Sequence, residues 1–195
     1  MKVGFLAALL ALVAGTVGAM VYFVPDALVQ SSEGGGTMSS MMELTSVAFE
    51  NNGMIPAEYT CDGDNQPVPL SVSGVPEGAR SLALVVDDPD IPEEVKVARG
   101  IDVFDHWVLY NINPDTAEIT PGSGAFGLNS AGSAAYTGPC PPSQYEPKEH
   151  RYVFTLYALS GSMNFIKAPT KEELLAAIEG QVIQTATLTG RYRRQ

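Results

Sequence analysis

The chain contains two histidines, His106 and His150, and each begins a stretch of alternating apolar residues directly after a loop. Two carboxylates, Asp88 and Asp90, follow another apolar stretch, in a turn that is held by prolines. A carboxylate near an imidazole favours the protonated imidazole, which is a good hydrogen-bond donor to phosphate. Three strand ends that carry His, His and Asp therefore predict a shared rim around a small anion pocket.

Residues 138–159, which read GPCPPSQYEPKEHRYVFTLYAL, contain further groups suited to such a pocket. Three prolines in residues 138–142 fix φ near −65° and remove backbone donors, so they predict a stiff loop. After the loop, His150 and Tyr152 begin one face of a period-2 pattern. A Tyr152 hydroxyl and free backbone N–H groups near Gly138 would complete an anion-binding nest. The alternative is that the aspartates cap a turn and the histidines satisfy polar groups in the core, and spacing alone leaves both interpretations open.

Other chemistries fit the sequence less well. His, His and Asp are allowed zinc ligands, but these histidines lack the short spacing of a metal motif. No G-x-S-x-G elbow is present, and no Cys or Ser has a sequence context that marks it as activated. Residues 122–127 match G-x-G-x-x-G but neither follow an apolar strand closely nor open a helix, so they read as a loop. We therefore expect a protein with no metal, no cofactor and no catalytic residues.

Composition, charge and cysteine count limit the classes of protein and of partner that fit the chain. Hydrophobic content of 45% and charged content of 17% are typical of a globular domain. The formal net charge is −11, and basic residues cluster only at the C-terminal end, so nucleic acid is excluded as a partner. The two cysteines, Cys61 and Cys140, are too few for a zinc cluster and lack C-x-x-C spacing. They would pair only if their Cα atoms lie close enough, and the sequence leaves this disulfide open.

The elements that must position these residues are mostly β-strands. One helix is predicted over residues 170–180, where Thr170 and Glu173 form a capping box and Gly180 a C-terminal cap. Residues 93–102 read as a polar excursion. Together they predict a mainly β single domain, a sandwich or Greek-key sheet with minor helices. Strands are expected at residues 44–49, 67–75, 81–86, 106–112, 150–159 and 182–192.

The N-terminal part reads differently. After Lys2, residues 1–25 are apolar and long enough to span a bilayer, which predicts a transmembrane signal anchor with the remainder outside the cytoplasm. A cleaved signal peptide competes, because residues 17–19 offer a small-residue cleavage site. Residues 26–42 are a Gly/Ser-rich tether, and the folded domain is expected at residues 43–195. The domain is thus expected to be membrane-anchored, or secreted or periplasmic if the segment is removed.

Several motifs in order resemble those of one family. Residues 87–92 (DDPDIP), 105–108 (DHWV), 138–142 (GPCPP) and 150–152 (HRY) are similar to the phosphatidylethanolamine-binding protein (PEBP) family, in its bacterial and archaeal Raf-kinase-inhibitor-like branch. The resemblance covers Leu44 to Arg194. It implies a large antiparallel sheet packed with a smaller one, few peripheral helices, and a small anion pocket.

The resemblance also implies a function and a set of site residues. It implies non-catalytic binding of phosphate or phospholipid headgroup-like ligands, and the alternative is an inhibitor or protein-interaction module that uses the pocket rim as its docking surface. The chain departs from the family pattern at Ile91, where a small residue is usual, and in the longer link at residues 144–149. An aromatic residue is also missing at Ile101, with only Phe104 remaining. Carried over by position, the ligand-binding residues are Asp88, Asp90, Pro92, His106, Gly138, Pro141, Pro142, His150 and Tyr152.

Overall fold

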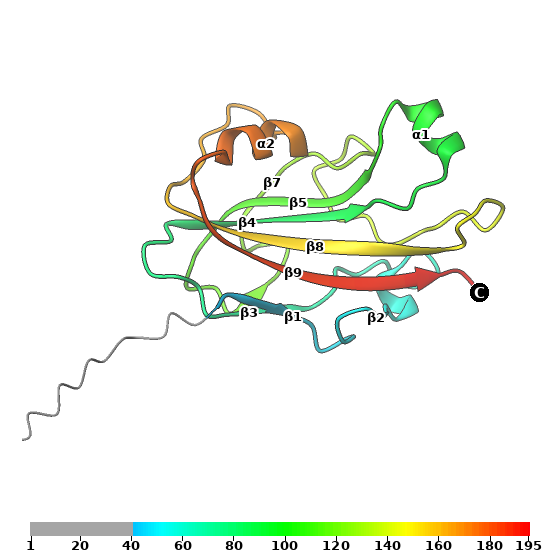
Figure 1. The fold of residues 1–195 in the computed structure, drawn as a ribbon, viewed down its shortest axis with the longest axis horizontal. Coiled ribbons are helices and arrows are strands. Elements are labelled where there is room, and N and C mark those ends of the chain that lie inside the picture. Colours follow the sequence, from blue (N-terminus) through cyan, green and yellow to red (C-terminus); the bar gives the residue numbers. More distant parts are fainter. Residues whose placement is uncertain (1–40) are drawn as a thin grey trace, which may run out of the picture. The chain divides into compact units, whose positions relative to one another are not determined.

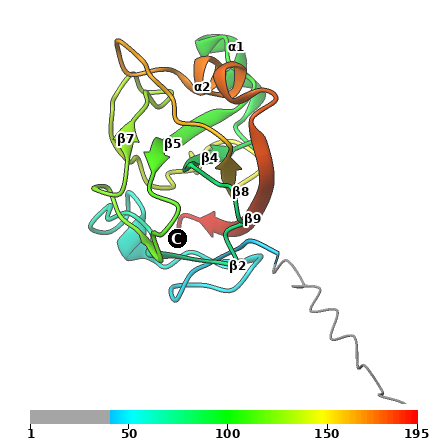
Figure 2. The same cartoon turned by 90° about the vertical axis from the view of Figure 1, so that its left-hand side faces the viewer.

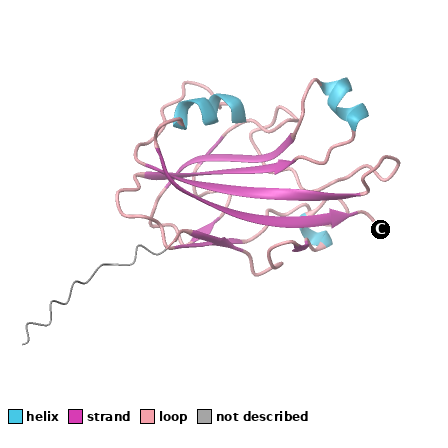
Figure 3. Cartoon of the chain, viewed as in Figure 1, coloured by secondary structure: helices cyan, strands magenta, loops and turns pink. Residues whose placement is uncertain are grey.

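The computed structural model describes residues 41–195, which form two sheets and short helices (Figure 1, Figure 3). The strands are β1 (Glu43–Thr45), β2 (Gly53–Met54), β3 (Leu70–Ser73), β4 (Ser81–Asp88), β5 (Phe104–Ile112), β6 (Glu118–Ile119), β7 (Ala125–Phe126), β8 (Glu149–Leu159) and β9 (Val182–Arg193). The helices are a 3₁₀ turn at Ala57–Tyr59, α1 (Glu93–Arg99) and α2 (Lys171–Ile178).

The large sheet has six strands in the order β2-β9-β8-β4-β5-β7, and the small sheet has three in the order β1-β3-β6. All neighbouring strands are antiparallel except the short pair β2 and β9, which is parallel. Figure 1 and Figure 2 show the small sheet on one side of the large sheet and α2 on the other. The predicted mainly β fold with two packed sheets and few helices is confirmed.

The central strand β4 shows why its sequence is apolar without alternation. Leu82, Leu84 and Val86 are buried in the core between the two sheets. Ala83 and Val85 are buried on the opposite face, in the cluster that includes Leu174 and Ile178 of α2. A strand covered on both faces needs apolar residues at every position.

The predicted helix at residues 170–180 forms as α2, with its capping box. The Thr170 hydroxyl accepts the N–H of Glu173, and the Glu173 carboxylate accepts the N–H of Thr170. Gly180 has a φ of 75°, a left-handed conformation that glycine adopts without strain and that ends the helix.

The polar excursion at residues 93–102 contains the helix α1, which the sequence analysis did not predict. This helix has no buried residue, so it lacks the apolar periodicity that sequence reading depends on. Its end signals are nevertheless present: Pro92 precedes it, Glu93 and Glu94 occupy the first turn, and Gly100 ends it with a φ of 66°.

The predicted fold class also included an N-terminal transmembrane helix, and this part is corrected. Within residues 41–195 no helix is long and apolar enough to cross a membrane. The fold is therefore a two-sheet β domain without a membrane span among its described elements. Residues 1–25, to which the anchor was assigned, and most of the predicted tether at residues 26–42 lie outside the described residues.

Candidate functional site

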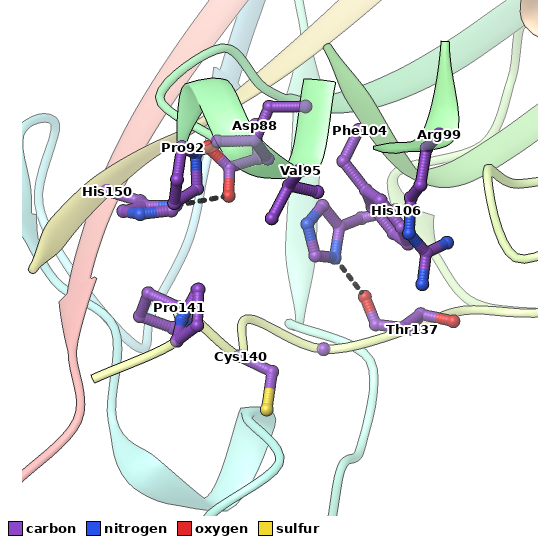
Figure 4. Close-up of a pocket in the computed structure, with 13 residues that line it drawn as sticks. Asp88, Pro92, Val95, Arg99, Phe104, His106, Thr137, Cys140, Pro141 and His150 are labelled. Carbon is purple, nitrogen blue, oxygen red and sulfur yellow. Dashed lines mark hydrogen bonds and ion pairs between the residues drawn. The ribbon is translucent and has the colours of Figure 1, made fainter. Parts of the chain in front are cut away.

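A pocket of about 290 Å³ opens at one end of the central strands of the large sheet, where β4 ends and β5 and β8 begin (Figure 4). Because β4 is antiparallel to both neighbours, its C-terminal end lies beside the N-terminal ends of the other two. Asp88 pairs with Phe104, and Asp87 pairs with Val153. The pocket is lined by Asp88, Ile91, Pro92, Val95, Arg99, Phe104, His106, Thr137, Gly138, Cys140, Pro141, Pro142 and His150.

His106 enters the pocket through a β-bulge. Val86 pairs with Trp107 and Asp87 with Asp105, so His106 is the extra residue on β5. A bulge changes the direction in which its side chain points. The His106 ring packs against Phe104 and against Tyr152, with ring centroids 4.8 Å and 5.1 Å away.

The proton on His106 can be located from its hydrogen bond. Its Nδ1 lies 2.6 Å from the carbonyl oxygen of Thr137, and a carbonyl only accepts, so Nδ1 carries a proton. Burial lowers the pKa of His106, although the Thr137 hydrogen bond and the charge of Asp88 act against this. The neutral ring leaves Nε2 as an unprotonated acceptor. Nε2 makes no hydrogen bond within the described residues, and Figure 4 shows this second nitrogen on the side of the ring that faces Asp88 and His150.

His150 and Asp88 form a closed pair. The His150 Nδ1 lies 2.6 Å from Oδ2 of Asp88, and its Nε2 lies 3.0 Å from the carbonyl oxygen of Pro147. The carbonyl requires a proton on Nε2, and one further proton lies between Nδ1 and Oδ2. Whether that second proton resides on Nδ1 of His150 or on Oδ2 of Asp88, the pair carries no net charge. His150 is 0% exposed and has no nitrogen left for a ligand.

Arg99 is the one fully charged basic side chain in the lining. It comes from the last turn of α1 and is exposed at the mouth, with its guanidinium 5.6 Å from the centroid of the Phe104 ring. Sequence reading missed Arg99 because it missed α1. The available signal was a basic residue one position before a helix-ending glycine.

Seven of the nine predicted site residues line the pocket, and Asp90 and Tyr152 do not. Both carboxylate oxygens of Asp90 bind Arg151: Oδ2 accepts from the backbone N–H and from Nε, and Oδ1 accepts from Nη2 at 2.6 Å. This ion pair lowers the pKa of Asp90 and raises that of Arg151. Asp90 thus ties the turn after β4 to β8 rather than facing the pocket.

Tyr152 lies behind the pocket wall. It is 0% exposed, its ring meets that of His106 nearly at right angles, and its hydroxyl, at which the Cys140 N–H is directed, donates no hydrogen bond within the described residues. Burial, and then the charge of Asp88, raises the pKa of Tyr152, so the hydroxyl remains a donor.

The loop at residues 137–142 offers fewer backbone donors than predicted. The N–H of Thr137 donates to the carbonyl of His106, and the N–H of Gly138 donates to Oδ1 of Asn65. Prolines occupy three further positions. The remaining N–H of this loop, that of Cys140, is directed at the Tyr152 hydroxyl. The loop therefore does not form the expected anion-binding nest at Gly138.

Gly138 itself is required by close packing. A Cβ atom there would lie 2.6 Å from the carbonyl oxygen of Tyr59, closer than real Cβ contacts allow. Cys140 and Cys61, whose pairing the sequence left open, form a disulfide with Cα atoms 5.4 Å apart. This wall of the pocket is thus covalently tied to the segment that follows the 3₁₀ turn.

A metal site finds no support in residues 41–195, where no group of three or more His, Cys, Asp or Glu residues is arranged to hold an ion. The carboxylate and both nitrogens of the Asp88–His150 pair already have partners.

A largely apolar pocket with a few convergent polar groups is the usual form of a small-ligand site. The fold and the pocket thus define a small two-sheet β domain of the ligand-binding class. The chain belongs to the phosphatidylethanolamine-binding protein family, whose model matches residues 45–193. The predicted family is confirmed.

Relatives and solved structures agree with this assignment. A UPF0098 protein of Methanothermobacter thermautotrophicus is 44% identical over 162 residues, which cover 78% of this chain and 99% of the relative. A putative PEBP homologue of Chlamydia trachomatis, CT736, has a crystal structure that matches with a TM-score of 0.73 and 40% identity, over 80% of this chain and 100% of that one. Escherichia coli YBCL, described as a member of the mammalian PEBP family, matches with a TM-score of 0.68 and 25% identity, over 80% of this chain and 100% of YBCL.

Proposed function

We propose that this domain binds small anionic or phosphorylated ligands, such as phosphate or a phospholipid headgroup, without chemically changing them. The observation that carries the proposal is the pocket of about 290 Å³ with the guanidinium of Arg99 in its lining. This volume lies near the lower end of the roughly 300–1,000 Å³ usual for small-molecule sites. It suits a headgroup and is too small for an acyl chain.

A positively charged donor for an anion lies at the pocket. The N–H of Cys140 is directed at the Tyr152 hydroxyl, which lies behind the pocket wall, so neither group is counted as a donor to the ligand. The guanidinium of Arg99 supplies a positive charge at the mouth. This one formal charge supports binding of a singly charged group.

The side chains at the pocket support binding rather than turnover. The sulfur of Cys140 is in a disulfide, and the Thr137 hydroxyl already accepts a hydrogen bond from Asn129 at 2.9 Å. Neither is activated by an adjacent base, as a nucleophile requires. His150 has both nitrogens occupied and is unable to act as a general base without breaking its pair with Asp88.

The disulfide also supports a location outside the cytoplasm, because disulfides persist in oxidising compartments and are rare in the cytosol. Trapping of free thiols in intact cells tests this. Cys61 and Cys140 should not react with the thiol reagent until a reductant is added.

Calorimetric titration with phosphoethanolamine tests the proposed function. We expect saturable binding to the wild type, no measurable binding to His106→Ala, and roughly tenfold weaker binding to Arg99→Ala, since a partly desolvated charged hydrogen bond contributes about 1.5 kcal/mol. Arg80→Ala, which removes an exposed arginine outside the pocket, is the matched control for Arg99→Ala. An absence of heat with the wild type at millimolar ligand would reject the proposal, provided that thermal unfolding shows a folded protein.

A further inference from the structure

Helix α1 forms one wall of the pocket, yet the core of the domain does not hold it. Val95 and Arg99 line the pocket from this helix, and Pro92 lines it from the position just before the helix. Figure 4 shows Val95 between His106 and His150. No residue of α1 is buried, and none belongs to either apolar core cluster. The pocket is therefore closed on this side by a helix without a buried face.

Polar contacts do not hold α1 either. Its N–H groups donate only to carbonyls of Pro92 and of the helix itself, and within the described residues its side chains form no hydrogen bond or ion pair. Pro92 at the N-terminal cap offers no side chain to accept the first N–H groups. The guanidinium of Arg99 lies over the Phe104 ring at 5.6 Å from its centroid, which is an exposed and weak contact.

The two ends of this segment, in contrast, are fixed to the large sheet. Before the helix, Asp90 accepts hydrogen bonds from the backbone N–H and from the guanidinium of Arg151 on β8. After the helix, Phe104 pairs with Asp88 in the ladder between β4 and β5. Residues 92–103 thus form a strap that is tied at both ends and is held by few contacts in its middle.

Helix α2 has a similar length and shows what α1 lacks. Leu174 and Ile178 of α2 are 0% and 2% exposed, and a capping box closes its N-terminal end. Helices shorter than about 12–15 residues are marginal in water and depend on such tertiary packing. Segments with few buried contacts open locally at much less free energy than the whole domain needs to unfold. We therefore expect α1 to open while α2 and the sheets stay folded.

We propose that α1 is a lid, which unfolds locally between its two fixed ends and thereby opens the pocket to molecules from solvent. Opening removes Val95 and Arg99 from the pocket wall, whereas Phe104 and His106 stay on β5. His106 is 5% exposed while α1 is folded, so it gains access to solvent when the lid opens. The helical stability of α1 then sets how often the pocket is accessible, whichever ligand it takes.

Hydrogen exchange of the full chain, read by mass spectrometry, measures the opening of α1. Peptides from residues 93–101 should exchange at least about tenfold faster than peptides from α2. Ala98→Gly, at an exposed position of α1, should increase the exchange about fivefold, because glycine costs about 1 kcal/mol relative to alanine inside a helix. Val97→Ala, at a position that is 76% exposed, should slow the exchange about two- to threefold, because valine is the poorer helix former.

Modification of histidine by diethyl pyrocarbonate, which acylates the neutral imidazole, tests whether this opening gives access to the pocket. The chain has two histidines, so one serves as target and the other as internal control. His106 should react about fivefold faster in Ala98→Gly and about two- to threefold more slowly in Val97→Ala. His150 is 0% exposed with both nitrogens hydrogen-bonded, and it should react slowly and equally in all variants.

Ala176→Gly is the matched control, because it makes the same change at an exposed position of α2. It should leave the exchange of α1 and the reactivity of His106 unchanged. Equal protection of α1 and α2 would overturn the proposal, and so would a reactivity of His106 that does not follow the exchange of α1. If Ala176→Gly accelerates the modification of His106 as much as Ala98→Gly does, opening belongs to the whole domain and α1 is not a lid.

Discussion

Substitution of Asp88 tests how the buried pair with His150 holds its protons. Oδ1 of Asp88 accepts the N–H of Asp90 at 2.9 Å, and Oδ2 lies 2.6 Å from Nδ1 of His150. The two side chains are 3% and 0% exposed. Asp88→Ala removes a partner from both groups at once. Because each buried group left unpaired costs about 1–3 kcal/mol, we expect a loss of about 2–5 kcal/mol in the free energy of unfolding.

Asp88→Asn should behave very differently. Its amide oxygen at the Oδ1 position continues to accept the N–H of Asp90. Its NH₂ at the Oδ2 position donates to Nδ1 of a neutral His150, whose Nε2–H continues to donate to the Pro147 carbonyl. Every hydrogen bond is preserved, so we expect a loss below about 1 kcal/mol.

Urea unfolding at pH 7, followed by circular dichroism, measures both variants. Asp115→Ala, which removes an exposed acid, is the control and should change stability by less than about 0.5 kcal/mol. An Asn variant as unstable as the Ala variant would show that His150 must be positively charged and that Asp88 must be ionised. If Asp88→Ala lowers the free energy of unfolding by less than about 1 kcal/mol, the argument that each buried group left unpaired costs about 1–3 kcal/mol is refuted.

Two further expectations concern stability. Replacing Cys61 and Cys140 by Ser opens a cross-link with a sequence separation of 79, and the chain-entropy model gives a loss of about 4–5 kcal/mol; urea midpoints of this variant should not respond to reductant, and a loss under about 1 kcal/mol would contradict the model. Burial, helped by the charge of Asp105 and opposed by that of Lys171, raises the pKa of Asp87 from its ordinary 3.8 to about 6. Because the folded protein then binds the proton more tightly than the unfolded chain, Asp87 lowers stability as pH rises from about 4 to 6, by about 2–3 kcal/mol at most. Asp87→Asn should remove this component, so the free energy of unfolding of the wild type and of the variant should depend differently on pH between about 4 and 6. The same pH dependence for both proteins would show that burial does not perturb the Asp87 carboxyl.

Local patterns in the sequence determined much of the fold. The unbroken apolar run at residues 82–86 of β4 predicted a buried strand, and the Thr170–Glu173 capping box predicted the start of α2, since both signals depend on residues within one element. The same reading proposed that Asp88, His106 and His150 share a rim, and the structure brings them to one pocket. The resemblance to the family rested on the same short motifs.

Tertiary structure decided how those residues are used. The bulge that turns His106 inward arises from pairing between β4 and β5, and the partner of His150 lies 62 residues away on β4. Asp90 pairs with Arg151 instead of facing the pocket, and Arg99 reaches the mouth from a helix without a buried face. Hydrogen-bond partners and burial are set by strands distant in sequence. Residue types therefore indicated where the site lies, and only the packed structure assigned its donors, acceptors and protons.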